Sequence, residues 1–410
     1  MNIIDVINKK KNKLELSYDE LAFAFNGYLE KQVPDYQMSA LLMAITINGM
    51  SYEETINLTD IFIKSGEVYH FDKDVCDKHS TGGVGDTVTL VAMPIVASLG
   101  VCCAKMSGRG LGITGGTIDK LESIPGFRTN LTKEEFYDVF NHTGFVVSSQ
   151  TNDLVPLDKV IYALRDVTGT TESIPLIASS IMSKKIACGA KYVVIDVKCG
   201  DGALVKTRDD ADKLSLWLQK IGESFGVSVR CLVTDMNEPL GNCVGNAIEV
   251  LNAIDVLQNN TKCKLRDVSL EVASAIIEMA KKISEEEATK LVLDAISSGK
   301  AFDKFKEWIS YQGGNLDGLK LDENTVYIKA KKDGIIRKIE ALKVGKLASY
   351  LGAGRKSKED RIDYGAGVKI LVNDGDVVKT DQELAVLYVR DQNIKLDDEL
   401  LDIFEIDETN

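Results

Sequence analysis

The hydrophobic and polar positions of the first 65 residues repeat with the period of an α-helix. Ser17 to Glu20 has the form of a capping box ahead of the amphipathic run 21–29. Ser51 to Glu54 repeats this form ahead of a second apolar run. Between the two, residues 40–47 are apolar on nearly every side. The pattern predicts a small helical bundle with one buried central helix.

From about residue 74 the pattern changes to apolar segments between glycines. Residues 87–99 and 193–197 are two such segments, and they alternate with helical stretches such as 211–225. This alternation predicts an α/β layer structure. Residues 157–185 look helical again, so we expect the helical domain to be built from two separated pieces of chain.

After about residue 325 the pattern is typical of short strands separated by turns. Strands are expected over residues 326–330, 334–339, 368–372 and 384–389. The expected fold is therefore α/β: a small helical domain, a large α/β domain with a mixed sheet, and a β-rich C-terminal lobe. The expected domain bounds are 1–65 with 157–188, 74–150 with 190–325, and 326–410.

Length and charge narrow the function classes. A chain of 410 residues exceeds what one hydrophobic core usually supports, so two or three compact units are expected. Its formal net charge of -13 repels a polyanion and argues against nucleic acid as a partner. The eight cysteines contain no C-x-x-C pair and no histidines at zinc-finger spacing, which indicates reduced thiols.

No segment of the sequence is typical of export or of a membrane. Residues 1–12 lack the apolar core and the cleavage site of a secretory signal. The longest apolar run, residues 90–104, is broken by Pro94 and Gly100 and is too short to span a bilayer. We therefore expect a cytoplasmic protein without a membrane partner.

Three clusters of glycines and hydroxyl groups lie within 40 residues of one another, at 77–86, 105–112 and 114–117. Glycines allow backbone N–H groups to approach a ligand, and hydroxyl groups donate further hydrogen bonds. The first two clusters each add a lysine, Lys78 and Lys105. Because the field that matters to a small anion is local, such a set can bind phosphate even on an acidic protein. Single glycine turns are usually structural, but three such clusters favour a phosphate site.

Two patterns imitate cofactor sites. The glycines of residues 110–115 have the spacing G-x-G-x-x-G, but residues 107–109 separate them from the preceding apolar strand, unlike a dinucleotide-binding turn. Residues 340–344 resemble the hairpin that carries biotin, but the Gly-Asp-x-Val turn at 375–378 follows this segment instead of preceding it. No organic cofactor is therefore expected.

Several motifs together are similar to one enzyme family. Residues 105–112 read Lys-Met-Ser-Gly-Arg-Gly-Leu-Gly, and residues 115–127 read Gly-Gly-Thr-Ile-Asp-Lys-Leu-Glu-Ser-Ile-Pro-Gly-Phe. With further matches at 162–168, 180–185 and 351–355, the chain resembles the thymidine and pyrimidine-nucleoside phosphorylases over nearly its whole length. The resemblance implies a helical domain, an α/β domain and a β-rich lobe, assembled as a homodimer.

The resemblance also implies roles for individual residues. Inorganic phosphate would be bound by Lys78, Ser80, Thr89, Lys105, Ser107 and Thr117. The pyrimidine of the nucleoside would be bound by Arg165, Ser180 and Lys184. This assignment puts the two reactants on different domains, so closure of a cleft is expected to bring them together.

Phosphorolysis needs no protein nucleophile, because phosphate itself attacks C1′. The protein has to orient two reactants and stabilise the negative charge that develops on the leaving base. Arg165 and Lys184 are the expected donors to its carbonyl oxygens. His79 is the candidate for protonating a base oxygen, since imidazole titrates near neutrality. Asp119, Lys120 and Glu122 are expected to fix their loop rather than react.

The chain departs from the family pattern at three positions. Ile113 stands where the family usually has histidine, and Asp201 where it more often has serine. Some members bind a monovalent cation, for which the matching residues here are Gly85, Thr87, Leu240, Cys243 and Asn252. Asn252 replaces the usual glutamate, so an amide oxygen would coordinate potassium without contributing a charge.

Two other hypotheses remain open. A homologue with altered catalysis would bind nucleoside and phosphate without turnover, as Ile113 and Asp201 suggest. A related phosphoribosyltransferase would need acidic residues for magnesium beside the glycine loop, where only Asp86 and Asp119 stand. The preference among uridine, deoxyuridine and thymidine is also left open.

Overall fold

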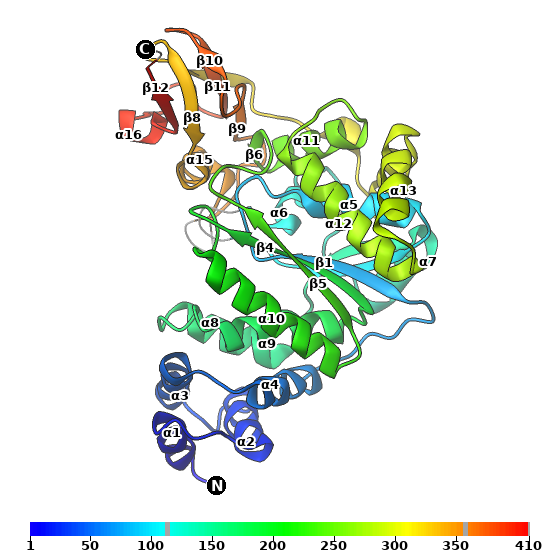
Figure 1. Cartoon of the computed structure of the whole chain (residues 1–410), viewed down its shortest axis with the longest axis vertical. Helices are drawn as coiled ribbons and strands as arrows, with labels where there is room; N and C mark the ends of the chain where they lie inside the picture. The colour runs from blue at the N-terminus through cyan, green and yellow to red at the C-terminus, as the bar shows by residue number, and fades with distance from the viewer. Residues whose placement is uncertain (111–114, 356–359, 409–410) are drawn as a thin grey trace. The chain divides into compact units, whose positions relative to one another are not determined.

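The computed structural model describes residues 1–110, 115–355 and 360–408 (Figure 1). Its internal contacts divide the chain into two compact units, both discontinuous in sequence. The first unit comprises residues 1–77, 150–193 and 212–231, and the second comprises 78–149, 194–211 and 232–410. The two-piece helical domain expected from the sequence therefore lies within the first unit.

The first unit is a helical bundle. Its helices are α1 (Ile3–Lys11), α2 (Tyr18–Leu29), α3 (Asp35–Asn48), α4 (Tyr52–Lys64), α8 (Pro156–Asp166), α9 (Ile174–Ala187) and most of α10 (Arg208–Ser224). Both predicted capping boxes are confirmed, because Ser17 and Ser51 each exchange hydrogen bonds with the glutamate three residues on. Glu54 also accepts two hydrogen bonds of 2.8 Å from the buried Lys10 ammonium, which joins α4 to α1.

The prediction of one buried central helix is wrong in one respect. Helix α3 packs against α1, α2 and α8 and buries Leu41, Leu42 and Ile45. Met43 and Ile47, on the same apolar run, are 38% and 74% exposed. An apolar pattern on all sides predicts burial on all sides, but this chain covers only one face of the helix.

A five-stranded sheet has the strand order β3-β2-β1-β4-β5. Its strands are β1 (Val75–Ser80), β2 (Cys102–Ser107), β3 (Phe145–Ser149), β4 (Tyr192–Cys199) and β5 (Ser228–Asp235), and the division between the units passes within β1, β4 and β5. Strands β2 and β3 are parallel, with Cys103 opposite Phe145. Every connection between consecutive strands of this sheet contains a helix, as is typical of a parallel sheet. The sheet is therefore parallel, whereas the sequence analysis expected a mixed sheet of parallel and antiparallel strands.

The sequence analysis counted residues 87–99 among the apolar segments that alternate with helices. In the structure they form a helix themselves, α5 (Val88–Ser98). All residues from Val88 to Val96 are buried, so α5 shows no polar face by which the sequence could reveal its helical period. Its neighbours in the second unit are α11 (Ala247–Leu257), α12 (Lys264–Lys281), α13 (Glu285–Ser297) and α14 (Lys300–Tyr311). Helices α6 (Thr117–Glu122) and α7 (Lys133–Thr143) complete this layer.

The C-terminal part of the second unit contains two antiparallel sheets. One has the order β6-β9-β11-β7, from Cys243–Gly245, Gly367–Ile370, Glu383–Val389 and Asn324–Lys329. The other has the order β10-β8-β12, from Val377–Val378, Gly334–Ile339 and Phe404–Asp407, and helices α15 (Ala341–Ala348) and α16 (Asp398–Leu401) accompany them. The four expected strands are confirmed, while β10, with two residues, and β12, with four, were missed.

Strand β6 connects this sheet to the preceding α/β part, since its residues 243–245 pair with 367–369 of β9. No helix in the described parts of the chain has the length and apolar character needed to cross a membrane.

Candidate functional site

Six residues with an expected role in phosphate binding belong to the second unit. Lys78 and Ser80 lie at the carboxyl end of β1, and Lys105 and Ser107 at the carboxyl end of the neighbouring β2. Thr89 and Thr117 stand in the first turns of α5 and α6. The Lys105 ammonium donates a 2.5 Å hydrogen bond to the Lys78 carbonyl and so joins the two strands at this edge. Ligands of parallel α/β sheets bind at this edge of the strands.

The Lys78 ammonium is the centre of a buried charge cluster. Its side chain is 1% exposed and lies 3.5 Å from Asp86 and 3.8 Å from Asp196. Burial lowers the pKa of Lys78 against the opposing effect of these two carboxylates. Burial would also raise the pKa of Asp86, but Lys78, Lys198 and Lys120 outweigh it and hold this pKa well below its usual range.

The glycine loop between β1 and α5 is held against β4. Gly82 and Gly85 have φ angles of +98° and +70°, which favour glycine. A side chain at Gly83 would lie 2.2 Å from the Met236 sulfur, so the loop can approach only without one. The Thr81 amide donates to the Asp196 carbonyl at 3.1 Å. The loop is therefore packed closely against Met236 and the backbone of β4.

Asp119 fixes the second glycine segment. Its carboxylate accepts a 2.6 Å hydrogen bond from the Gly110 amide and pairs at 2.7 Å with Arg355. A Cβ atom at Gly116 would lie 2.2 Å from the Gly110 nitrogen, so the loop after Ser107 is packed against the start of α6. Arg355 belongs to the motif at 351–355, whose purpose the sequence did not reveal. Ile113 lies outside the described residues.

The three residues expected to bind the pyrimidine belong to the first unit. The Lys184 ammonium donates to the Ser180 hydroxyl at 2.8 Å and forms an ion pair with the buried Asp158. Asp158 is held in the first turn of α8, and its Oδ1 atom has no hydrogen-bond partner among the described residues. Asp158 thus orients Lys184, a role that the sequence analysis missed.

Arg165 is almost fully buried in the same unit. Its guanidinium donates to the backbone carbonyls of Thr170, Thr171 and Leu176, at 2.9–3.3 Å. Burial lowers the pKa of Arg165, with Asp158 opposing. These contacts hold the segment between α8 and α9. Its expected contact with the base stays a prediction.

His79 is half-buried between Lys78 and Ser80 on β1. Successive side chains of a strand point to opposite faces of the sheet, so His79 lies on the other face from these two residues. Its expected role in protonating a base oxygen stays a prediction.

The residues matched to a cation site come close together. A Cβ atom at Gly85 would lie 3.3 Å from the Cys243 carbonyl oxygen, and one at Gly241 would lie 2.6 Å from the Asn252 amide oxygen. That buried amide oxygen has no hydrogen-bond partner in the described parts of the chain. The Thr87 hydroxyl donates to Glu249 at 2.9 Å, which leaves its lone pairs available. Leu240 joins the set through a 3.0 Å hydrogen bond from its amide to the Val84 carbonyl.

Carbonyl, amide and hydroxyl oxygens suit a hard cation rather than a transition metal. The described residues contain no group of three or more His, Cys, Asp or Glu side chains that could hold a metal ion.

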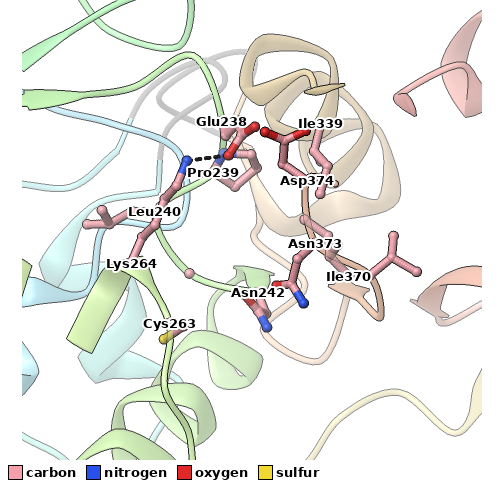
Figure 2. A pocket seen from close by; sticks show the side chains of 12 residues that line it. Glu238, Pro239, Leu240, Asn242, Cys263, Lys264, Ile339, Ile370, Asn373 and Asp374 are labelled. Atoms are coloured by element: carbon pink, nitrogen blue, oxygen red, sulfur yellow. Dashed lines mark hydrogen bonds and ion pairs between the residues drawn. The ribbon is translucent and has the colours of Figure 1, made fainter. Parts of the chain in front are cut away.

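A pocket of about 190 Å³ lies beside the same segment, where residues 238–242 face Ile370 and the turn at 373–374 (Figure 2). Glu238 and Lys264 form an ion pair at its edge. Of the candidate residues it includes Leu240 but none of the phosphate group, so this pocket is not the expected site of the chemistry.

Comparison with known proteins assigns the family. A glycosyl transferase family helical bundle domain matches residues 4–66, a glycosyl transferase family a/b domain matches 72–302, and a pyrimidine nucleoside phosphorylase C-terminal domain matches 335–403. Curated pyrimidine-nucleoside phosphorylases of Staphylococcus epidermidis and Bacillus subtilis are each 45% identical to the chain, over 96% of its length and 93% of theirs. The chain belongs to the pyrimidine-nucleoside phosphorylase family. The phosphorylase of Geobacillus stearothermophilus is likewise 45% identical, over 95% of this chain and 92% of its own.

Among solved structures, the anthranilate phosphoribosyltransferase of Thermus thermophilus has the same fold. It aligns with a TM-score of 0.63 at 16% identity, over 75% of this chain and 99% of its own. At that identity the likeness concerns the fold alone. The family assignment therefore rests on the phosphorylases.

Sequence reasoning also missed Asp196 and Lys198. Both are fully buried in β4, and they pair at 2.6 Å. The signal that could have found them is the position of two charged residues in the apolar run that begins at Val193, because charges in a buried strand need partners.

Asp86 provides a test of this charge cluster in acid. Its pKa in the folded protein is below the unfolded value of about 3.9, so its carboxylate stabilises the folded state above that pH and loses this contribution as the pH falls. We expect Asp86→Asn to lower the midpoint temperature of thermal unfolding, measured by calorimetry, at pH 7. We also expect this midpoint to fall less steeply in Asp86→Asn than in wild type as the pH is lowered from about 4 to 2. The exposed Asp402→Asn should leave both unchanged. Parallel declines of Asp86→Asn and wild type would contradict the assignment.

Proposed function

We propose that the protein cleaves the N-glycosidic bond of pyrimidine nucleosides with inorganic phosphate, releasing the free base and ribose 1-phosphate or 2-deoxyribose 1-phosphate. The proposal is supported by 45% identity to pyrimidine-nucleoside phosphorylases over 96% of the chain. The observation that carries it is the buried Lys78 ammonium, which lies beside a glycine loop at the carboxyl ends of two parallel strands. Such a combination of cation and loop suits an oxyanion.

In this proposal the second unit holds the nucleophile. Phosphate accepts hydrogen bonds from Lys78, Ser80, Thr89, Lys105, Ser107 and Thr117. It then attacks C1′ of the sugar as the bond to the base breaks, and the orientation of two bound reactants can remove about 7–11 kcal/mol of such a barrier. The reaction requires no organic cofactor.

The first unit holds the leaving group. Lys184, oriented by Asp158 and Ser180, donates to a carbonyl oxygen of the pyrimidine and stabilises the charge that develops there. Arg165 assists as a second cation, and His79 supplies a proton to a base oxygen. The two groups belong to different units of the chain.

The structure weakens one of the two reasons for the alternative of a homologue that binds its ligands without turnover. Asp201, one of the two residues that suggest this alternative, forms an ion pair of 3.3 Å with Lys338. The side chain of Asp201 is 64% exposed, so water screens its remaining charge. The cytoplasmic location expected from the sequence stays a prediction.

The function is tested with uridine, deoxyuridine and thymidine in the presence and absence of phosphate, by the absorbance of the free base. We expect release that depends on phosphate. Lys78→Met should raise the KM for phosphate at least tenfold, and Lys184→Met should lower kcat/KM for the nucleoside at least tenfold, because each removes one charge-assisted hydrogen bond worth about 1.5–3 kcal/mol. Lys206→Met, at an exposed position, is the control. No release at saturating phosphate would refute the proposal.

We further propose that Gly85, Thr87, Leu240, Cys243 and Asn252 bind potassium. The support is the buried Asn252 amide oxygen, which has no hydrogen-bond partner among the described residues and lies beside Gly241, near the Gly85 carbonyl. The ion would tie the glycine loop after β1 to residues 240–243. Because asparagine contributes no charge, we expect weaker binding than a carboxylate would give.

Potassium binding is measured by thermal unfolding in KCl against LiCl at equal ionic strength. At ten times the dissociation constant a bound ion stabilises by about 1.4 kcal/mol, which raises the midpoint by a few degrees. Asn252→Ala should abolish the difference and Asn252→Glu should enlarge it. Asn260→Ala, an exposed control, should not alter it. Identical midpoints in both salts for wild type would exclude the site.

We propose, finally, that the protein forms a homodimer through α3 and α8. These helices pack together in the first unit and expose the large apolar side chains Tyr36, Met43, Ile47 and Tyr162, and the exposed Val167 follows the last residue of α8. Exposed apolar side chains of this number on adjacent helices are typical of an interaction surface. A second copy of the chain is the partner that the resemblance implies.

Light scattering tests the dimer. Wild type should have twice the mass of the 44.9 kDa chain, and Ile47→Glu should shift it toward the monomer because a buried unpaired charge destabilises the interface. Leu371→Glu replaces an exposed apolar residue of the C-terminal part and should leave the mass unchanged. A monomeric wild type would contradict the proposal.

A further inference from the structure

Two charged side chains occupy the interior of β4 without a role in the reaction described above. Asp196 and Lys198 are both 0% exposed, and as residues i and i+2 of a strand they point to the same face of the sheet. Burying charges is costly unless they are paired. A pair at this depth therefore calls for an explanation in its surroundings.

The Lys78 ammonium lies next to this pair. Asp196 Oδ1 accepts a 2.5 Å hydrogen bond from the Thr234 hydroxyl, so this oxygen is already used. Its Oδ2 atom lies 2.6 Å from the Lys198 ammonium and 3.8 Å from that of Lys78. Two lysines thus share one carboxylate oxygen, and Lys198 holds the nearer position. Lys78 lies slightly nearer to Asp86, at 3.5 Å.

Lys198 also contacts the loop that follows Lys78. Its Cγ atom would lie 3.4 Å from a Cβ atom at Gly83, so the lysine stem lies directly beneath the loop. Its amide donates to the Thr81 hydroxyl at 2.9 Å, while the Thr81 amide donates to the Asp196 carbonyl. Backbone and side chain of this short stretch of β4 therefore both act on the loop.

Six buried charged side chains form a cluster around the Lys78 ammonium, and their charges balance when Lys198 is present. Lys78, Lys120 and Lys198 face three carboxylates, namely Asp86, Asp196 and Glu249, and Lys120 pairs with Glu249 at 2.7 Å. Without Lys198 the cluster would carry one excess negative charge. That charge would draw Lys78 toward Asp196 and would repel an approaching anion.

We propose that Lys198 is a positioning residue for phosphate: by occupying Asp196, it leaves the Lys78 ammonium where the nucleophile meets it. The proposal rests on the function of Lys78 proposed above. Lys198 is fully buried and acts through Lys78 without touching phosphate. In this proposal the negative charge of Asp196 would attract Lys78, and Lys198 neutralises that charge.

The experiment compares Lys198→Met, Asp196→Asn and the double variant in steady-state kinetics with uridine and phosphate. Lys198→Met should raise the KM for phosphate at least tenfold, which corresponds to about 1.4 kcal/mol, because Asp196 then attracts the Lys78 ammonium. The KM for uridine should stay within about twofold of wild type. Adding Asp196→Asn should restore most of the loss, since a neutral amide no longer attracts Lys78. Lys206→Met serves as the exposed control.

The rescue separates positioning from mere support of the fold. If the pair only stabilised the strand, the double variant would be at least as impaired as either single variant, and both KM values would change together. Should Lys198→Met fail to fold, Lys198→Arg decides: it retains the charge and is expected to keep the KM for phosphate within about threefold of wild type. A tenfold rise in Lys198→Arg, or an unchanged KM for phosphate in Lys198→Met, overturns the inference. Loss of phosphate dependence in wild type would instead refute the proposed function.

Discussion

The burial of the Lys78 ammonium is the constraint on which the second unit depends. A cation removed from water is stable only beside carboxylates, and here Asp86 and Asp196 lie within 4 Å of it. Those carboxylates need their own partners, which Lys198 and the Thr234 hydroxyl supply to Asp196. Several buried charged side chains are therefore needed to stabilise one ammonium group, and the glycine loop and the ends of β1 and β4 pack around them.

The first unit solves the same problem on a smaller scale. Lys184 is oriented by the buried Asp158, and the neighbouring Lys185 pairs with Asp77 at 2.6 Å. In both units the cation expected to meet a reactant is held by a carboxylate that belongs to the same unit. Each of these cations is thus preorganised within its own unit, which lowers the cost of orienting a ligand there.

Local signals of the sequence were sufficient where structure is local. The capping boxes at Ser17 and Ser51 and the four strands with alternating or apolar patterns lie where they were expected. The pattern failed at α5, because a helix buried on every side has no polar face, and at α3, because exposed Ile47 is as apolar as its buried neighbours. It also missed Asp158, whose importance depends on Lys184, 26 residues further along the chain.

The sequence by itself determined the family, the fold class and the residue types of both candidate groups, since glycine spacing, hydroxyls and lysines are readable without coordinates. Only the tertiary structure decided which charges meet. Lys78 and Asp196 are 118 positions apart, and no periodicity relates them until β1 and β4 become neighbours in the sheet. Coulomb interactions depend on distance in space, whereas patterns depend on distance along the chain, and for buried ion pairs these two distances are unrelated.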